Sequence, residues 1–336
     1  MYNFVNDYSK SCHENILKAM NKINDTVYTG YGNDTISINT RNLINNIIKK
    51  DAVIQFLIGG TLTNKVGISH SLKPYEAIIA PTTAHIAVHE TGAIEDTGHR
   101  IIEIPSYDGK IISEDIIKAF NLHTDEHLVK PKLVYISNTT ECGTVYSKEE
   151  LEQIYNTCKK LGLYLYIDGA RLACCLSSSL TLEDIANNCD IFTIGAAKNG
   201  ALFGEALVIV NENLKENIRY TIKQKGAMIS KGWLVSLQFN TLFENNLFFN
   251  LGEHSNNMAK KLANSFENVG IKFRYPVQSN QIFPIIQDKH IDKLKEKANF
   301  EIWEKLENET VVRFVCSFST LENEVNDFCD FIKNNF

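Results

Sequence analysis

The chain has 336 residues, of which 44% are hydrophobic and 22% are charged, and its formal net charge is −6. This length predicts one large domain plus a smaller one, and this hydrophobic content argues against global disorder. The lack of a basic block argues against a nucleic-acid partner, and no run approaches the roughly 18 apolar residues of a membrane-spanning helix.

Eight cysteines occur, but none forms a C-x-x-C pair and no cluster of histidine and cysteine has zinc spacing. The sequence therefore predicts no metal site. The cysteines, several of them in apolar contexts, indicate buried, reduced thiols and thus a cytoplasmic protein. The first residues carry neither a basic region nor an apolar core, so we expect no signal peptide.

The N-terminal part reads as an arm over residues 1–35, followed by an amphipathic helix over 35–50. A strand over 52–58 then runs into Gly59, Gly60 and Thr61, which have the character of a turn that starts a helix. Amide groups at a helix N-terminus bind anions, so Gly60 and Thr61 are candidates to hold a phosphate. A plain strand-to-helix turn is the alternative.

Further strands are predicted over 77–80, 100–104 and 133–136. His85 follows the first of them closely, so its ring could lie flat on an aromatic cofactor. The alternative for His85 is a capping or core histidine. Polar residues over 137–145 follow the strand that ends at Ile136, as suits either a site or an ordinary loop.

The stretch from Leu163 to Glu205 carries the strongest signal. A buried strand over 163–167 ends in Asp168, and a second strand over 190–194 runs toward Lys198, 30 residues after that aspartate. This spacing fits one strand–helix–strand unit, whose parallel strands present their carboxyl ends on one edge of the sheet. We therefore expect the acid and the amine to face one crevice.

Each residue also has a simpler interpretation, because Asp168 could start a turn and Lys198 could be a solvated loop lysine. Their combination, with Arg171 three residues after the aspartate, favours a cofactor site. Pyridoxal phosphate needs an aspartate beside its pyridine nitrogen and a lysine that forms a Schiff base with its aldehyde.

Strands alternating with helices over 52–210 predict an α/β fold with a mostly parallel sheet and helices on both faces. A smaller α+β domain follows. Arg313 lies within the last predicted strand of this domain. It is either a surface residue or a buried guanidinium that binds a carboxylate through two donors. We divide the chain into an arm, a large domain and a small C-terminal domain: 1–35, 36–245 and 246–336. The helices and strands expected after Val210 cover 213–226, 231–243, 246–269, 271–275, 282–286, 291–298, 311–317 and 322–334.

This pattern resembles the low-specificity L-threonine aldolases, pyridoxal-phosphate-dependent enzymes of fold type I that are grouped with the β-eliminating lyases. The resemblance covers nearly the whole chain, and Asp168 to Arg171 followed by Lys198 is its sharpest part. It implies cleavage of L-threonine, L-allo-threonine or related β-hydroxy-α-amino acids to glycine and an aldehyde. It also implies a homodimer or homotetramer with active sites at the subunit interface, where Lys225 or Lys231 would reach the phosphate.

The resemblance also implies roles for single residues. Lys198 would form the Schiff base, Asp168 would pair with the pyridine nitrogen, and His85 would stack on the ring. Gly60 and Thr61 would hold the phosphate. The residues implied at the substrate carboxylate are Asn6, Arg171 and Arg313, with Arg171 also beside the ring oxygen.

The chain departs from the family pattern at three places. The loop after Ile136 lacks the second histidine that many members have, Ala197 replaces a hydroxyl residue before the lysine, and Glu205 replaces a small residue. The base for the substrate hydroxyl is thus open among His85, Glu90, Glu141 or a water. Alternatives to the aldolase are another fold-type-I enzyme, such as a β-eliminating lyase or an aminotransferase, and a non-catalytic scaffold protein.

Overall fold

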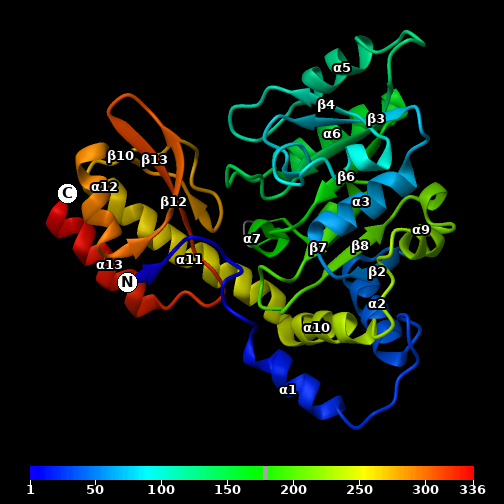
Figure 1. Cartoon of the computed structure of the whole chain (residues 1–336), viewed down its shortest axis with the longest axis horizontal. Coiled ribbons are helices and arrows are strands. Elements are labelled where there is room, and N and C mark those ends of the chain that lie inside the picture. Colours follow the sequence, from blue (N-terminus) through cyan, green and yellow to red (C-terminus); the bar gives the residue numbers. More distant parts are fainter. Residues whose placement is uncertain (177–179) are drawn as a thin grey trace.

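The computed structural model describes residues 1–176 and 180–336, which form a large domain and a smaller one (Figure 1). The centre of the large domain is a seven-stranded sheet. In spatial order its strands are β2 (Val53–Leu57), β8 (Glu205–Ile209), β7 (Ile191–Gly195), β6 (Tyr164–Asp168), β5 (Lys130–Ser137), β3 (Glu76–Pro81) and β4 (Ile101–Ile104).

Six of these strands run in one direction, and β8 alone is antiparallel to its neighbours β7 and β2. The predicted mostly parallel α/β sheet is confirmed. Because β8 is reversed, its first residue, Glu205, lies at the same edge of the sheet as the last residues of the other strands.

The central strands read as continuous apolar runs because both faces of the sheet are covered. In β6, Leu165 and Ile167 point into one core cluster while Tyr166 between them points into the other. Side chains alternate across a strand, so a strand covered on both sides needs apolar residues at every position.

Two sets of helices supply these covers. One face packs against α1 (Glu14–Ile23), α2 (Thr35–Ile48), α5 (Ser113–Asn121), α6 (Lys148–Leu161), α7 (Leu172–Leu176), α8 (Leu182–Asn187) and α10 (Trp233–Phe243). The other packs against α3 (Gly60–Ser71), α4 (His85–Val88) and α9 (Ile218–Gln224). Within the described ranges, no helix is long and apolar enough to cross a membrane.

The basic stretch after Val210 is not the single helix expected over 213–226. It forms a 3₁₀ turn at Glu212–Leu214 and then α9. Asn217, between them, has a left-handed backbone with φ of 63°, which a continuous helix does not tolerate.

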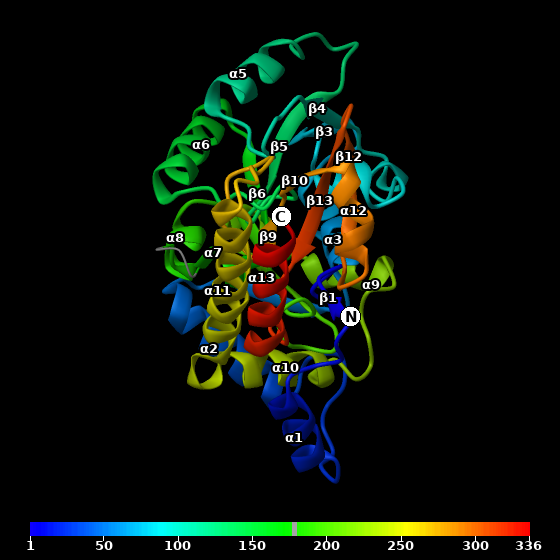
Figure 2. The ribbon, with the colours of Figure 1, turned by 90° about the vertical axis from the view of Figure 1, so that its left-hand side faces the viewer.

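The long helix α11 (Leu247–Asn268) joins the two domains. It follows α10 after Asn245 and Asn246, both of which have left-handed φ angles that turn the chain. It packs on α7 of the large domain and on α13 (Glu322–Asn335), which lies beside it in Figure 2. The glycine at 252 permits the first contact, because a Cβ there would lie 2.3 Å from the carbonyl oxygen of Ala173.

The small domain contains an antiparallel sheet that α11, α12 (Asp288–Lys295) and α13 cover. Its strands are β9 (Gln281–Ile282), β10 (Ile285–Gln287), β12 (Glu301–Lys305) and β13 (Glu309–Val315). The N-terminal strand β1 (Tyr2–Asn3) pairs with β11 (Ala298–Asn299), and Phe4 lies in this domain's core.

Two strand predictions in this domain are wrong. The run 282–286 is split between β9 and β10 because Pro284 has no amide hydrogen for a continuous ladder. The expected strand over 271–275 forms only an isolated bridge between Phe273 and that proline. The strand β12 was not predicted.

We expect Gly252→Ala to lower the free energy of unfolding by about 1–3 kcal/mol, because the new methyl group overpacks the contact with Ala173. The gain in helix propensity, about 1 kcal/mol, is smaller than this clash. Urea denaturation measures the difference. Asn250→Ala, on the exposed side of the same helix, is the control and should leave stability unchanged or slightly higher. Equal stability of the two variants would contradict the close contact.

Candidate active site

The structure brings Asp168 and Lys198 to one cavity. Asp168 is the last residue of β6, and Lys198 lies three residues beyond the end of the neighbouring parallel strand β7. Both side chains line a cavity of about 220 Å³, which we call the inner cavity and whose wall also includes Gly60, Asn64 and Glu205. The sequence-based expectation that the acid and the amine face one crevice matches this placement.

The turn after Asp168 packs directly on β7. The amide of Gly169 donates a hydrogen bond of 2.8 Å to Thr193 Oγ1, and a Cβ on this glycine would lie 2.0 Å from the carbonyl oxygen of the same threonine. No side chain fits in that space. The glycine therefore fixes how closely the two strand ends, and the two functional residues, approach each other.

Asp168 is buried and accepts three hydrogen bonds. Tyr135 Oη and Asn64 Nδ2 donate to its Oδ2 at 2.6 and 2.9 Å, and the amide of Ala170 donates to its Oδ1 at 2.9 Å. Several donors are what a carboxylate needs when it is shielded from water. These three hydrogen bonds hold the side chain in place.

Asn64, on α3, connects Asp168 to His85. Its Nδ2 also donates to Glu90 Oε1 at 3.0 Å, and its Oδ1 accepts from Tyr166 Oη at 2.9 Å. The same oxygen of Glu90 lies 2.8 Å from His85 Nδ1. Glu90 thus orients the imidazole, and one amide holds the acid and the histidine in a single network.

The surroundings of Lys198 favour its neutral form. Burial lowers the pKa of its amine, and the nearby Arg171 lowers it further, against the opposite effect of the carboxylates of Asp7, Glu205 and Asp168. An amine must lose its proton before it can attack an aldehyde. The lowered pKa therefore suits a lysine that forms a covalent bond to a carbonyl group.

The N-terminus of α3 opens on the same cavity. Gly59, Gly60 and Thr61 all line it, and the N-cap residue of this 12-residue helix, Gly59, provides no side-chain cap for the first amides. Uncapped amides and the helix dipole attract an anion. The structure thus places both predicted phosphate ligands, Gly60 and Thr61, where a phosphate group could be bound.

A second cavity of about 620 Å³, the outer cavity, adjoins the first and lies between the two domains. Arg313, Glu301 and Trp303 of the small domain contribute to its wall. The two cavities share five residues, which therefore mark their junction: Tyr8, His85, Glu141, Arg171 and Lys198.

Arg171 is held by a residue that sequence analysis did not single out. Its Nε and Nη2 donate to the two carboxylate oxygens of Asp7 at 2.7 and 3.0 Å, and Asn280 Nδ2 also donates to that carboxylate at 3.0 Å. Burial opposes ionisation of Asp7, but the positive charges of Arg171 and Lys198 outweigh it, so the pKa of Asp7 is lowered.

The structure does not bring Asn6 to either cavity. Its Oδ1 accepts hydrogen bonds from the amide of Tyr8 at 3.1 Å and from Ser9 Oγ at 2.8 Å, which closes a local turn. Short side chains with an oxygen commonly form such turns. The turn instead directs its neighbours toward the site, with Asp7 on Arg171 and Tyr8 at the junction of the cavities.

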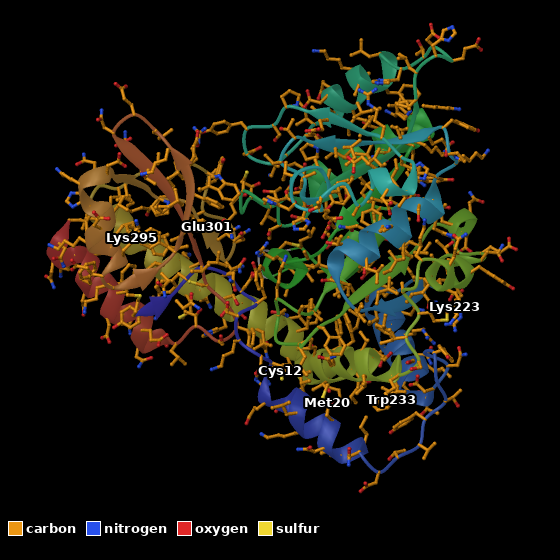
Figure 3. The ribbon with its side chains drawn as sticks, in the orientation of Figure 1. Cys12, Met20, Lys223, Trp233, Lys295 and Glu301 are labelled. Atoms are coloured by element: carbon orange, nitrogen blue, oxygen red, sulfur yellow. The ribbon has the colours of Figure 1, made fainter. Side chains whose placement is uncertain are left out.

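Arg313 lines the outer cavity, pairs with Glu301, and lies 5.5 Å from the centre of the Trp303 ring. Figure 3 shows Glu301 on the side of the small domain that faces the large one. In the described parts of the chain, the buried Nε of Arg313 has no hydrogen-bond partner. One donor of this guanidinium thus remains for a ligand.

Glu141 lies in the loop after β5, which lacks the second histidine of the family pattern. Its Oε1 accepts from Ser137 Oγ at 2.7 Å and from the amide of His85 at 3.0 Å. Its buried Oε2 contacts no donor among the residues that the structure describes. Burial raises the pKa of this carboxyl, as suits a group that accepts a proton in a reaction.

Sequence analysis gave no role to Asn64, Asp7 and Tyr135, which hold the predicted residues in place. It considered Glu90 only as a base, whereas the structure places this carboxylate on His85. Asn64 carried a weak signal, since it follows a strand end, but Asp7 and Tyr135 carried none. Their contacts join segments far apart in the chain: 104 residues between Asn64 and Asp168, and 164 between Asp7 and Arg171. No local pattern reports such a contact.

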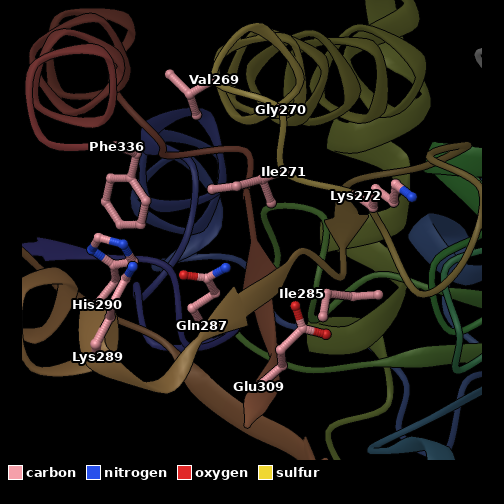
Figure 4. A pocket seen from close by; sticks show the side chains of 10 residues that line it. All are labelled: Val269, Gly270, Ile271, Lys272, Ile285, Gln287, Lys289, His290, Glu309 and Phe336. Carbon is pink, nitrogen blue, oxygen red and sulfur yellow. The ribbon is translucent and has the colours of Figure 1, made fainter.

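A further hollow, of about 470 Å³, lies on the small domain (Figure 4). Lys272, Lys289, His290 and Glu309 line it together with apolar residues and the C-terminal Phe336. None of the predicted site residues borders this hollow, so we assign the chemistry to the inner and outer cavities.

The fold defines the class of protein. The chain has the fold-type-I, aminotransferase-like architecture, since it superimposes on the aspartate aminotransferase of Thermus thermophilus with a TM-score of 0.72. That alignment covers 99% of this chain and 91% of the other, and at 13% identity it reports on the fold alone.

The chain belongs to the β-eliminating lyase family, whose sequence model matches residues 9–289. It is 30% identical to a low-specificity L-threonine aldolase of Pseudomonas, over 96% of this chain and 95% of that one. The solved threonine aldolase of Leishmania major is 47% identical, with a TM-score of 0.98 and 99% of both chains aligned. The predicted resemblance to this family is confirmed.

We expect Asn64→Ala to lower the free energy of unfolding by about 1–3 kcal/mol, because Asp168, Glu90 and Tyr166 each lose a buried partner. The loss of unfolding free energy caused by Asn64→Asp should grow as the pH rises from 5 to 8. Its new carboxyl lies between two others, so its pKa is raised in the folded state and folding is favoured by protonation.

Urea denaturation at both pH values measures these effects. The control is Asn45→Ala, which removes a half-buried amide that bonds to the backbone groups of Ala52. A smaller loss for Asn45→Ala supports the network. A loss for Asn64→Asp that does not depend on pH would contradict the proximity of the two carboxylates.

Proposed function

We propose that this protein is a pyridoxal-phosphate-dependent lyase that cleaves the Cα–Cβ bond of L-threonine, L-allo-threonine or related β-hydroxy-α-amino acids. The products are glycine and an aldehyde. The observation that carries the proposal is the pair of adjoining cavities, an inner one with Asp168 and Lys198 and an outer one with Arg171 and Arg313. The names of the similar aldolases from Pseudomonas and Leishmania support it.

The residues of the inner cavity fit the cofactor. Lys198, with its lowered pKa, would hold the aldehyde carbon, Asp168 would face the pyridine nitrogen, and His85 would lie on the ring. The first amides of α3, at Gly60 and Thr61, would bind the phosphate. When bound, pyridoxal phosphate supplies an electron sink for the bond that breaks.

The outer cavity fits the amino acid. Arg171 and Arg313 both line it, and their positive charges would bind the substrate carboxylate. Fixing the carboxylate sets the orientation of the Cα–Cβ bond, and orientation of this kind can lower a barrier by several kcal/mol. Asp7 holds Arg171 rigidly, so this anchor is positioned before substrate arrives.

We assign Glu141 as the base that accepts the proton of the substrate hydroxyl. Of the two buried carboxyls considered as bases, Glu90 borders only the inner cavity, whereas Glu141 borders both. The Oε2 atom of Glu141 would accept the hydroxyl proton as the aldehyde leaves. His85 also borders both cavities, but its Nδ1 is engaged by Glu90 and its ring is assigned to the cofactor.

A homodimer or homotetramer with active sites at the subunit interface is part of the proposal. Tyr8, at the junction of the cavities, is 58% exposed, and Leu202, four residues after Lys198, is 39% exposed. Large apolar side chains exposed beside a site suit a covering partner. The cytoplasmic location stays a prediction from the cysteine content.

The test of the function uses Lys198→Ala. Purified wild-type protein with pyridoxal phosphate should show the visible absorbance of a lysine-bound cofactor and should convert L-threonine or L-allo-threonine to glycine. The variant should lose both properties, since no amine remains to hold the aldehyde. The control is Lys132→Ala, on β5 and outside both cavities, which should keep them. A keto acid as product would indicate an aminotransferase instead.

We expect Glu141→Gln to lower kcat for L-threonine by about 10²–10⁴-fold, the usual loss when a general base is removed. The amide oxygen can still accept from Ser137 and from the amide of His85, so the melting temperature should change little. In the wild type, kcat should rise with pH through the raised pKa of this carboxyl, and this rise should be absent in the variant. An unchanged kcat would exclude Glu141 as the base.

A further inference from the structure

Glu205 lines the inner cavity at the point where the ends of β7 and β2 meet the start of β8. As the first residue of the reversed strand β8, it pairs with Gly195 at the end of β7 and with Leu57 at the end of β2. The first strand end leads to Lys198, and the second leads to Gly60. The glutamate is thus placed between the segment that carries the amine and the segment that starts α3.

The carboxyl of Glu205 points at the start of α3. Its Oε1 lies 3.8 Å from where a Cβ on Gly60 would be. The residue is only 5% exposed, and within residues 1–176 and 180–336 its Oε2 has no hydrogen-bond partner. A buried polar atom without a partner is costly, so this atom is suited to a ligand group in the cavity.

The surroundings of Glu205 disfavour its ionised form. Burial and the negative charge of Asp168 raise the pKa of its carboxyl, Lys198 opposes both, and the net value is about 8. Tyr166, the other titratable group that senses this carboxyl, is itself buried and has a pKa well above its usual value. Leu57 and Gly60 add no charge. Because the pKa of its carboxyl is about 8, Glu205 holds a proton over much of the neutral range.

We propose that Glu205 is a protonation-dependent ligand of the cofactor phosphate, donating a hydrogen bond to it as the neutral acid and repelling it as the carboxylate. The inference rests on the proposed binding of pyridoxal phosphate at the N-terminus of α3. Helix amides attract the phosphate at any pH, whereas a carboxyl beside them adds a donor only while it keeps its proton. Affinity for the phosphorylated cofactor therefore falls as the pH rises above about 8.

The experiment compares pyridoxal phosphate with pyridoxal, which lacks the phosphate. Dissociation constants for both are measured by absorbance titration between pH 7 and 9.5. Both ligands share any pH dependence that arises at Lys198, so the ratio of their affinities isolates the phosphate. In the wild type, this ratio should fall with pH by up to about tenfold per unit once Glu205 ionises.

The variant is Glu205→Gln, whose amide donates at every pH. For this variant, the ratio of the affinities for pyridoxal phosphate and pyridoxal at pH 7 should stay within about threefold of the wild-type ratio. The fall of that ratio at high pH should disappear. The control is Glu76→Gln, another buried carboxyl on the same sheet but at the starting end of β3, which should keep the wild-type slope. A Glu205→Gln ratio that falls as in the wild type would overturn the inference.

Two further outcomes would also count against it. Equal pH dependence for both ligands in the wild type would mean that Glu205 acts on Lys198 rather than on the phosphate, while leaving the proposed function intact. Failure of the wild type to bind pyridoxal phosphate at any pH would remove the proposed function itself.

A second measurement needs no variant, in case Glu205→Gln does not fold. Inorganic phosphate should raise the melting temperature of the wild type at pH 7 and lose most of that effect at pH 9. The same shift at both values would overturn the inference.

Discussion

Charged groups buried at one edge of a sheet are the constraint on which the rest of this structure depends. Asp168, Glu90, Glu205 and Asp7 are buried near one lysine, and Glu141 is half-buried beside them, with its Oε2 shielded from water. Ions without partners are costly in such a place. Hydrogen-bond donors offset this cost for three of the carboxylates: Asn64 donates to Asp168 and Glu90, and Arg171 donates to Asp7. The other two, Glu141 and Glu205, have raised pKa values.

The two domains contribute different residues to the two cavities. The acid, the amine and the helix N-terminus of the inner cavity all come from the large domain. The small domain contributes Arg313 and Trp303 to the outer cavity only. The N-terminal segment runs from one domain to the other, since Phe4 is in the core of the small domain while Asp7 holds Arg171. Both domains and this segment therefore meet at the outer cavity.

Sequence reasoning was accurate where the signal was local and failed where it was not. The strands that end before Asp168 and Lys198 were recognisable because both faces of the sheet are covered, which demands apolar residues throughout. Asn6 was predicted at the substrate, but its side chain is satisfied within its own turn. The strand expected over 271–275 fails because its partner segment contains Pro284. In both cases the outcome depended on which partner the residue or segment contacts in the folded chain, and the sequence pattern did not report that partner.

The sequence by itself determined the alternation of strands and helices in the large domain and the positions of the acid and the amine. These features depend on side-chain volume, backbone freedom and burial within short segments, and such properties are readable locally. Only the tertiary structure decided which groups surround them: Asn64 on Asp168, Asp7 on Arg171, and Glu205 beside Gly60. These contacts join residues more than a hundred positions apart, and their protonation depends on a burial that exists only once the chain has folded.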